Sequence, residues 1–97
     1  MAEFILTYRM PQDYAMGDAE TMQSWQAWFT GMGDDLLDMG KPAQAAEQIG
    51  SCGPGTWLGG FSIIRADSAA EAREIARRCP GLGSGGGVEV GSLIDVG

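Results

Sequence analysis

Apolar and polar side chains alternate near the start of the chain, over residues 3–10. One side of an extended chain there carries Phe4, Leu6, Tyr8 and Met10, and the other carries Ile5, Thr7 and Arg9. A two-residue period is typical of a β-strand, and apolar residues on both sides indicate a strand covered on both faces. Residues 57–66 repeat the period, with Phe61, Ile63 and Arg65 on one side and Ser62, Ile64 and Ala66 on the other. The pattern therefore predicts two strands.

Residues 19–39, between these strands, change to a helical period. Their apolar positions form one stripe, made of Met22, Trp25, Trp28, Phe29, Met32, Leu36 and Met39. Asp18 is the expected N-cap, while Gly40 and Pro42 end the helix. Gly31 and Gly33 would each weaken this helix. We explain their presence by the close approach of a neighbouring backbone rather than by a kink.

A second helix follows the strand at residues 57–66. Ser68 and Glu71 have the spacing of a capping box, and Pro80 ends the helix. Its buried stripe is expected to contain Ala69, Ala72, Ile75, Ala76 and Cys79. Residues 81–87 then form a glycine-rich loop, and alternation over residues 88–96 predicts a last strand.

The segment at residues 43–52 has the weakest pattern, because Ala and Gln are poor strand formers. It fits either a short strand or irregular chain, and connectivity favours an edge strand. The order is then βαββαβ, an α+β ferredoxin-like fold with a four-stranded antiparallel sheet and two helices on one face. The length fits a single domain over residues 1–97. Because the strands carry apolar residues on both sides, we expect the second sheet face to pack against another copy in a homodimer.

Composition excludes several classes of function. Thirteen acids against six bases give a net charge of −7, which disfavours nucleic-acid binding. No apolar run approaches the roughly 20 residues of a membrane span, and the first residues lack the pattern of a signal peptide. Two cysteines and no histidine disfavour a zinc site, and we expect a cytoplasmic protein with free thiols. The run GLGSGG has the spacing of a phosphate loop, but a helix precedes it and a strand follows it, so we expect no cofactor.

Several residues carry candidate chemistry. Trp25, Trp28 and Phe29 either frame a pocket for a planar ligand or belong to the core. Asp34 and Asp38 would lie one helical turn apart, where paired carboxylates either act as general acid and base or form a solvated face.

Arginines within the strands have several interpretations. Arg9 and Arg65 are expected at a sheet edge, in a salt bridge of the dimer, or as a clamp for an anion. Lys41 is a further candidate for the anion clamp. Cys79 lies on a buried stripe and is expected to be an inert core residue.

Two stretches of the chain resemble the YCII-related (DGPF-type) family. GGFSIIRADSAAEAREIARRCP followed by GGGVEV is similar to the C-terminal half of its members, and WQAWFTGMGDDLLDMGKP is similar to one branch of the family. The positions that match this branch are Trp25, Trp28, Gly33, Asp34, Asp38 and Pro42. The resemblance implies a dimeric α+β barrel and a small-ligand pocket. The His–Asp site proposed for part of the family does not carry over, because the chain has no histidine, and the DGPF signature is absent.

Three functions agree with these observations. We favour a homodimer that binds a small molecule near the dimer seam through Arg9, Trp25, Trp28 and Lys41. The second is a lyase- or isomerase-type enzyme with Asp34 or Asp38 as the general base and Arg9 or Lys41 as the anion clamp. The third is a structural or regulatory dimer that acts on a partner protein.

Overall fold

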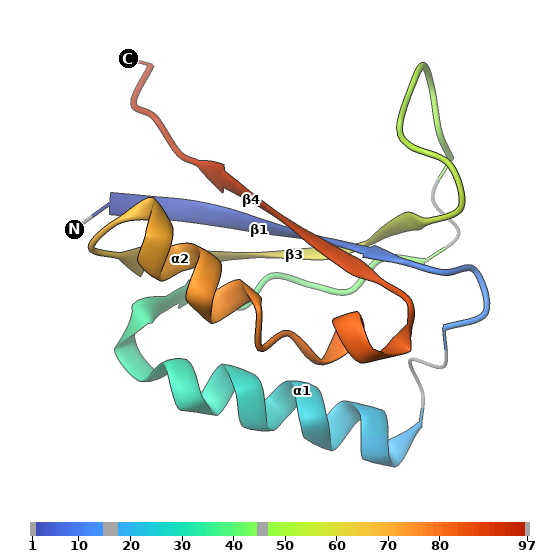
Figure 1. The fold of residues 1–97 in the computed structure, drawn as a ribbon, viewed down its shortest axis with the longest axis horizontal. Coiled ribbons are helices and arrows are strands. Elements are labelled where there is room, and N and C mark those ends of the chain that lie inside the picture. The colour runs from blue at the N-terminus through green and yellow to red at the C-terminus, as the bar shows by residue number, and fades with distance from the viewer. Residues whose placement is uncertain (1, 15–17, 45–46, 97) are drawn as a thin grey trace.

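The computed structural model describes residues 2–14, 18–44 and 47–96 and contains one four-stranded sheet. The strands β1 (Ala2–Met10), β2 (Leu36–Asp38), β3 (Trp57–Ala66) and β4 (Gly87–Ser92) lie in the order β2-β3-β1-β4, and every neighbouring pair is antiparallel. The helices α1 (Ala19–Met32) and α2 (Ala69–Ala76) both lie on one face of this sheet (Figure 1). The prediction of an α+β ferredoxin-like fold is confirmed.

The core lies between this sheet and the helices. β1 contributes the four alternating residues that the sequence placed on one side, each at most 5% exposed: Phe4, Leu6, Tyr8 and Met10. β3 adds Ser62, Ile64 and Ala66, and the α2 region adds Ala72, Ala76 and Cys79. Ala69, which the sequence placed on the buried stripe, is exposed because it lies in the first turn of α2.

Both predicted N-caps are present. The Asp18 carboxylate accepts hydrogen bonds from the backbone N–H groups of Glu20 and Thr21, at 2.8 and 3.2 Å. The Ser68 hydroxyl oxygen accepts one from the N–H of Glu71 at 3.1 Å. Each cap satisfies backbone donors that the first turn leaves without a helical partner, so it fixes where the helix begins.

The first helix is shorter than predicted. It ends at Met32 rather than Met39, because Gly33 adopts a φ of +56°, a backbone conformation that glycine tolerates and a regular helix excludes. A short 3-10 helix at Gly33–Asp35 and then β2 replace its last turns. Asp34 and Asp38 therefore do not lie one turn apart on a helix face, and that part of the prediction is wrong.

The second strand lies earlier in the chain than predicted. It is β2, in which Leu36 pairs with Ile64 of β3, rather than a strand within residues 43–52. In that range, residues 43–44 and 47–52 are not in a strand, and residues 45 and 46 lie outside the described part of the chain. After β2, a bridge between Pro42 and Gly60 and a hydrogen bond from the Ala43 N–H to the Gly59 carbonyl hold the chain beside β3.

The C-terminal part differs from the prediction in two details. Pro80–Ser84 forms a 3-10 helix inside the predicted glycine loop, and β4 ends at Ser92 rather than Val96. No helix of the described residues is long and apolar enough to cross a membrane.

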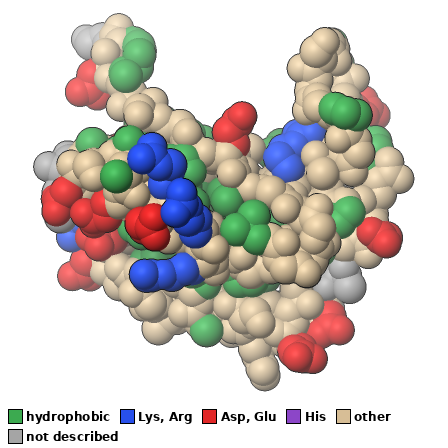
Figure 2. All heavy atoms as spheres, viewed as in Figure 1, with side chains coloured by type: hydrophobic (Ala, Val, Ile, Leu, Met, Phe, Trp, Pro, Cys, Tyr) green, Lys and Arg blue, Asp and Glu red, His purple; other side chains and the backbone are tan. Residues whose placement is uncertain are grey.

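The sheet face opposite the helices is uncovered (Figure 1). It carries Ile5 and Thr7 of β1 beside their partners Ile63 and Phe61 of β3. The chain around residues 47–56 and the segment after β4 project beyond this face, and an acidic side chain stands between the two projections (Figure 2). Glu89 of β4 pairs with Thr7 and so lies on this side of the sheet. We call this surface, defined by Ile5, Thr7, Phe61 and Ile63, the open face.

Gly40 and Gly31 provide a matched pair for testing the changed course of the chain. Gly40 has a φ of +70°, and a Cβ there would overlap the Phe61 carbonyl group, whereas a Cβ on Gly31 would meet no atom within 4 Å. The predicted close backbone approach is therefore wrong for Gly31, and also for Gly33, where a Cβ would likewise meet no atom within 4 Å. We expect Gly40→Ala to lower the free energy of unfolding by about 2 kcal/mol or more. Gly31→Ala should raise it by about 0.5–1 kcal/mol, because alanine favours the helix. Urea denaturation measures both, and equal effects would contradict this description.

Candidate functional site

Helix α1 stands away from the sheet on aromatic side chains. None of its described residues is buried, and its inner side meets the sheet through a cluster of rings. The Tyr8 ring of β1 lies 4.9 Å from the ring of Trp25 and 6.0 Å from that of Trp28, with both contacts edge-on. Phe29 adds further contacts to both indoles, at 5.9 and 5.2 Å. Such edge-to-face contacts are favourable, and the width of the rings keeps the helix from closing onto the strands.

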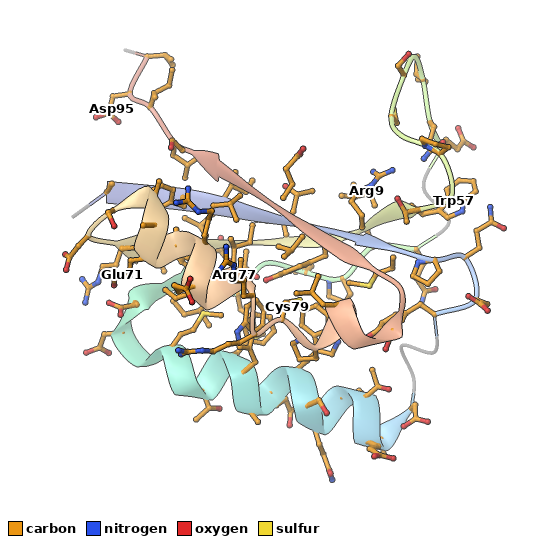
Figure 3. The ribbon with its side chains drawn as sticks, viewed as in Figure 1. Arg9, Trp57, Glu71, Arg77, Cys79 and Asp95 are labelled. Carbon is orange, nitrogen blue, oxygen red and sulfur yellow. The ribbon has the colours of Figure 1, made fainter. Side chains whose placement is uncertain are left out.

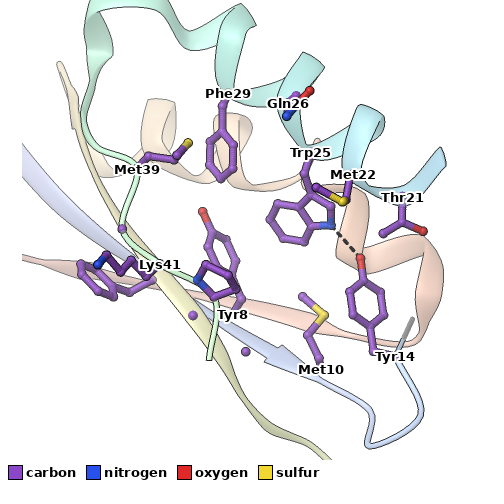
Figure 4. A pocket seen from close by; sticks show the side chains of 15 residues that line it. Tyr8, Met10, Tyr14, Thr21, Met22, Trp25, Gln26, Phe29, Met39 and Lys41 are labelled. Atoms are coloured by element: carbon purple, nitrogen blue, oxygen red, sulfur yellow. Dashed lines mark hydrogen bonds between the residues drawn. The ribbon is translucent and has the colours of Figure 1, made fainter. Parts of the chain in front are cut away.

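The separation leaves a cavity of about 240 Å³ between α1, β3 and the chain after β2 (Figure 4). We call this cavity the α1 pocket. Its walls are mainly aromatic side chains, methionines and glycine backbone, and the full lining is Tyr8, Met10, Tyr14, Thr21, Met22, Trp25, Gln26, Phe29, Met39, Gly40, Lys41, Pro42, Gly59, Gly60 and Phe61. Concave apolar sites with few polar groups are typical of small-molecule binding.

A chain of hydrogen bonds begins at Tyr8, under this pocket. The Tyr8 hydroxyl donates to Ser62 Oγ at 2.8 Å, and the Ser62 hydroxyl donates to the Met39 carbonyl at 2.8 Å. Burial raises the pKa of Tyr8 above its ordinary value. The phenol therefore stays neutral at physiological pH and remains the donor to Ser62.

A second hydroxyl, that of Tyr14, lies beside Trp25. The Trp25 indole N–H donates to the Tyr14 oxygen at 2.6 Å (Figure 4). The neighbouring indole of Trp28 donates instead to the Ile75 carbonyl of α2 at 3.2 Å. Both tryptophans therefore have fixed positions, Trp25 toward the pocket and Trp28 toward α2.

Glycines make room for Met10 at the floor of the pocket. A Cβ on Gly59 would come within 2.7 Å of Met10 Cγ, and one on Gly86 within 2.8 Å of its sulfur. A Cβ on Gly81 would overlap Met10 Cε and lie 3.2 Å from Trp25 Cζ2. The GLGSGG run is thus rich in glycine partly because it packs closely against the pocket floor.

The sequence-predicted residues have different positions relative to the pocket. Trp25 and Lys41 line it, and Trp28 packs behind Trp25 without lining it. Arg9 does not line the pocket and lies near Trp57, on the side of the sheet away from the helices (Figure 3). Its guanidinium donates to the carbonyls of Cys52 and Thr56, at 2.8 and 3.0 Å, and so holds the projecting loop.

The acidic candidates also lie outside the pocket lining. Asp34 is exposed in the 3-10 helix, and the Asp38 carboxylate accepts a hydrogen bond from the Gly40 N–H at 2.8 Å, which shapes the turn into the pocket wall. Asp35 pairs with Arg65 at 3.2 Å, so Arg65 makes its ion pair within the chain. The structure therefore brings no carboxylate among the described residues into the α1 pocket.

The thiols and metal-ligand residues do not extend the site. Cys79 is buried, as predicted, and burial raises the pKa of its thiol to about 11, while Cys52 is exposed. Among the described residues, no group of three or more His, Cys, Asp or Glu side chains could hold a metal ion.

Sequence reasoning did not identify Tyr8, Met10 and Tyr14 as pocket residues. Tyr14 lies in a turn without periodicity, so no pattern indicated its orientation. Tyr8 and Met10 were correctly placed on the buried side of β1, but alternation cannot distinguish a core position from a pocket floor. A second hollow of about 480 Å³ shares Met10, Tyr14 and Gly59 with the α1 pocket.

The role of Gly81 can be tested without a ligand. In Gly81→Ala the new methyl group must displace the flexible end of Met10, which we expect to cost about 1 kcal/mol of stability. The resonance of the Met10 methyl group, observed by NMR with labelled methionine, should shift because the group moves relative to the Trp25 indole. Gly83→Ala is the matched control, since its Cβ would meet no atom within 4 Å. Equal spectra for the two variants would contradict the packing described.

Comparisons with known proteins agree with this architecture. The family model of the YCII-related domain matches residues 2–95. No protein of curated function showed significant similarity to the chain. A solved structure of similar fold is 5-chloro-2-hydroxyhydroquinone dehydrochlorinase from Burkholderia phenoliruptrix AC1100, in complex with 2,5-dihydroxybenzoquinone. It superposes with a TM-score of 0.69 over 97% of this chain and 95% of that chain, at 14% sequence identity, a likeness that shows the fold alone. The chain therefore belongs to the YCII-related family.

Proposed function

We propose that this protein is a homodimer that binds a small planar molecule in the α1 pocket. The observation that carries the proposal is the apolar cavity of about 240 Å³ between α1 and β3, with Trp25 and Phe29 on the helix side and the backbone of Gly59 and Gly60 on the strand side. A dry apolar cavity of about 150 Å³ is enough to bind benzene. The α1 pocket therefore suits one substituted ring.

The similar enzyme structure supports the same class of ligand. Its bound 2,5-dihydroxybenzoquinone is a single oxygenated ring, which agrees in size with the α1 pocket. Among the sequence candidates, Trp25 would stack on such a ring, Trp28 would hold Trp25 in place, and Lys41 would meet a negative group at the opening. Arg9 would act indirectly, through the loop at residues 50–56.

An enzyme of the lyase or isomerase type is the second candidate, favoured by the dehydrochlorinase activity of the similar structure. It would use Asp34 or Asp38 as the general base. Asp38 directly precedes Met39, which lines the pocket, but its carboxylate accepts a hydrogen bond from Gly40. We favour binding because the described lining residues include no carboxylate, thiol or imidazole.

The open face supports the homodimer. Its central residues Ile5 and Ile63 pair directly across β1 and β3 and face away from the helices. Large apolar side chains also project beside it, with Ile49 92% and Ile94 77% exposed. A second copy covering this face would remove these groups from water, which is the main driving force for association.

The pocket and the dimer interface would meet at Phe61. This residue pairs with Thr7 on the open face and also contributes to the pocket lining. A partner on the open face would therefore approach the pocket edge, as the prediction of a site near the seam requires.

We place this protein in the cytoplasm, as a single domain with free thiols and without nucleic-acid, membrane, metal or cofactor partners.

Ligand binding can be tested by calorimetry with two single-ring probes, 2,5-dihydroxybenzoquinone and 4-hydroxybenzoate. We expect at least one to bind, and Trp25→Leu to weaken it about tenfold or more, because the variant removes an aromatic wall. Asp34→Asn is the control and should leave affinity unchanged. If neither probe binds, a dimer that acts on a partner protein becomes the better description. If Asp34→Asn abolishes a measurable turnover, the enzyme replaces the binder.

The dimer can be tested by size-exclusion chromatography with light scattering. We expect a mass of twice the 10.2 kDa of the chain at micromolar concentration. Ile63→Lys should give the monomer, since it places a charge in the centre of the open face. Leu82→Lys places the same charge at an exposed apolar residue outside that face and should stay dimeric. A stable wild-type monomer would refute the homodimer.

A further inference from the structure

The hydroxyl of Tyr8 can only accept a hydrogen bond from a ligand. The Tyr8 hydroxyl donates its proton to Ser62 Oγ, and this direction is fixed because the Ser62 hydroxyl donates its own proton to the Met39 carbonyl, which has no proton to give. In Figure 4 the Tyr8 hydroxyl points from β1 toward Phe29, across the space between sheet and helix. The raised pKa of Tyr8 keeps this arrangement at physiological pH. A ligand atom that meets Tyr8 must therefore carry its own hydrogen.

The hydroxyl of Tyr14 has the opposite preference. Its oxygen already accepts the indole N–H of Trp25 at 2.6 Å, so its own hydrogen remains for an acceptor. Two further polar side chains of the lining, Thr21 and Gln26, can each donate and accept hydrogen bonds, so they favour neither a donor nor an acceptor on the ligand.

Lys41 adds a positive charge at the opening. It is exposed, it lines the pocket, and it makes no ion pair with the described residues. No carboxylate is present among the described lining residues, although the chain as a whole carries a net charge of −7. The described lining thus carries one positive and no negative side chain, which favours an anion over a cation.

We propose that the ligand is a hydroxylated aromatic anion with a single ring. Its neutral hydroxyl donates to Tyr8, and its negatively charged oxygen lies near Lys41, with Tyr14 able to donate to a further oxygen. This inference rests on the proposed function, because it assigns the ligand class of the same α1 pocket. A carboxylate and an ionised ring hydroxyl share this chemistry.

The pattern can be tested with matched probes in calorimetric titrations of the full chain. 4-Hydroxybenzoate has both groups, benzoate lacks the hydroxyl, 4-methoxybenzoate keeps the oxygen without its hydrogen, and 4-hydroxybenzyl alcohol lacks the charge. Each of the last three should bind about fivefold more weakly than the first. 4-Nitrocatechol has one ionised and one neutral ring hydroxyl at mildly alkaline pH, so it carries its negative charge on a ring oxygen instead of a carboxylate. Whichever of 4-nitrocatechol and 4-hydroxybenzoate binds more tightly shows which of these two groups the pocket prefers.

Two variants assign these preferences to residues. Tyr8→Phe should abolish the preference for 4-hydroxybenzoate over 4-methoxybenzoate while leaving the Ser62 bond to Met39 intact. Lys41→Gln should weaken both benzoates alike, by about fivefold. Arg73→Gln removes the same charge from an exposed position of α2 and should leave every affinity unchanged. Thermal melts verify that each variant folds.

The outcomes separate this inference from the proposed function. If the wild type binds the hydroxylated, methoxylated and unsubstituted rings equally, the inference is wrong and the binding function stands. A Tyr8→Phe variant that keeps the full preference would also overturn it. If no ring probe binds at all, both proposals fail.

Discussion

The contact of Tyr8 with Trp25 and Trp28 is the interaction on which the rest of the structure depends. A helix that packs on a sheet through aliphatic side chains interdigitates closely with it and leaves few voids. Here two tryptophans of α1 meet Tyr8 of β1, at 4.9 and 6.0 Å between ring centres, and Phe29 packs against both indoles. The rings hold α1 in place and keep it apart from β3. One set of contacts thus stabilises the fold and also creates the α1 pocket.

This arrangement requires backbone that lies close to side chains on the strand side. Gly60 presents bare backbone to the pocket and lies against Lys41, since a Cβ there would come within 2.8 Å of the Lys41 carbonyl. Gly40 lies against the Phe61 carbonyl in the same way. These glycines let the chain after β2 run beside β3 and close one wall of the pocket. The same principle explains the glycine-rich run after α2, which packs against Met10.

The elements that the sequence predicted well are those with local causes. Alternation specified β1 and β3, and Asp18 and Ser68 specified where the two helices begin, because each cap satisfies its own backbone. The predicted end of α1 was wrong because Leu36 is apolar and has helical spacing from Met32, although it does not belong to the helix. It belongs to β2 and packs on the core from there. The positive φ of Gly33 decides between the alternatives, and composition does not reveal it.

The residues of the site also divide into those that a local pattern predicts and those that depend on tertiary contacts. Trp25 was predictable because an aromatic stripe on a helix must face something large, whereas Tyr14 reaches the pocket from a turn and depends on tertiary contacts. The predicted pairing of Asp34 and Asp38 was wrong because it assumed a continuous helix. Once the helix ends at Met32, Asp35 binds Arg65 and Asp38 caps a turn, so their charges serve the fold. The polar character of the pocket instead comes from two buried or half-buried phenols, whose hydrogen-bond directions are set by Ser62 and Trp25. A neutral phenol with a committed proton is selective at little electrostatic cost, because no buried charge has to be paid for by desolvation.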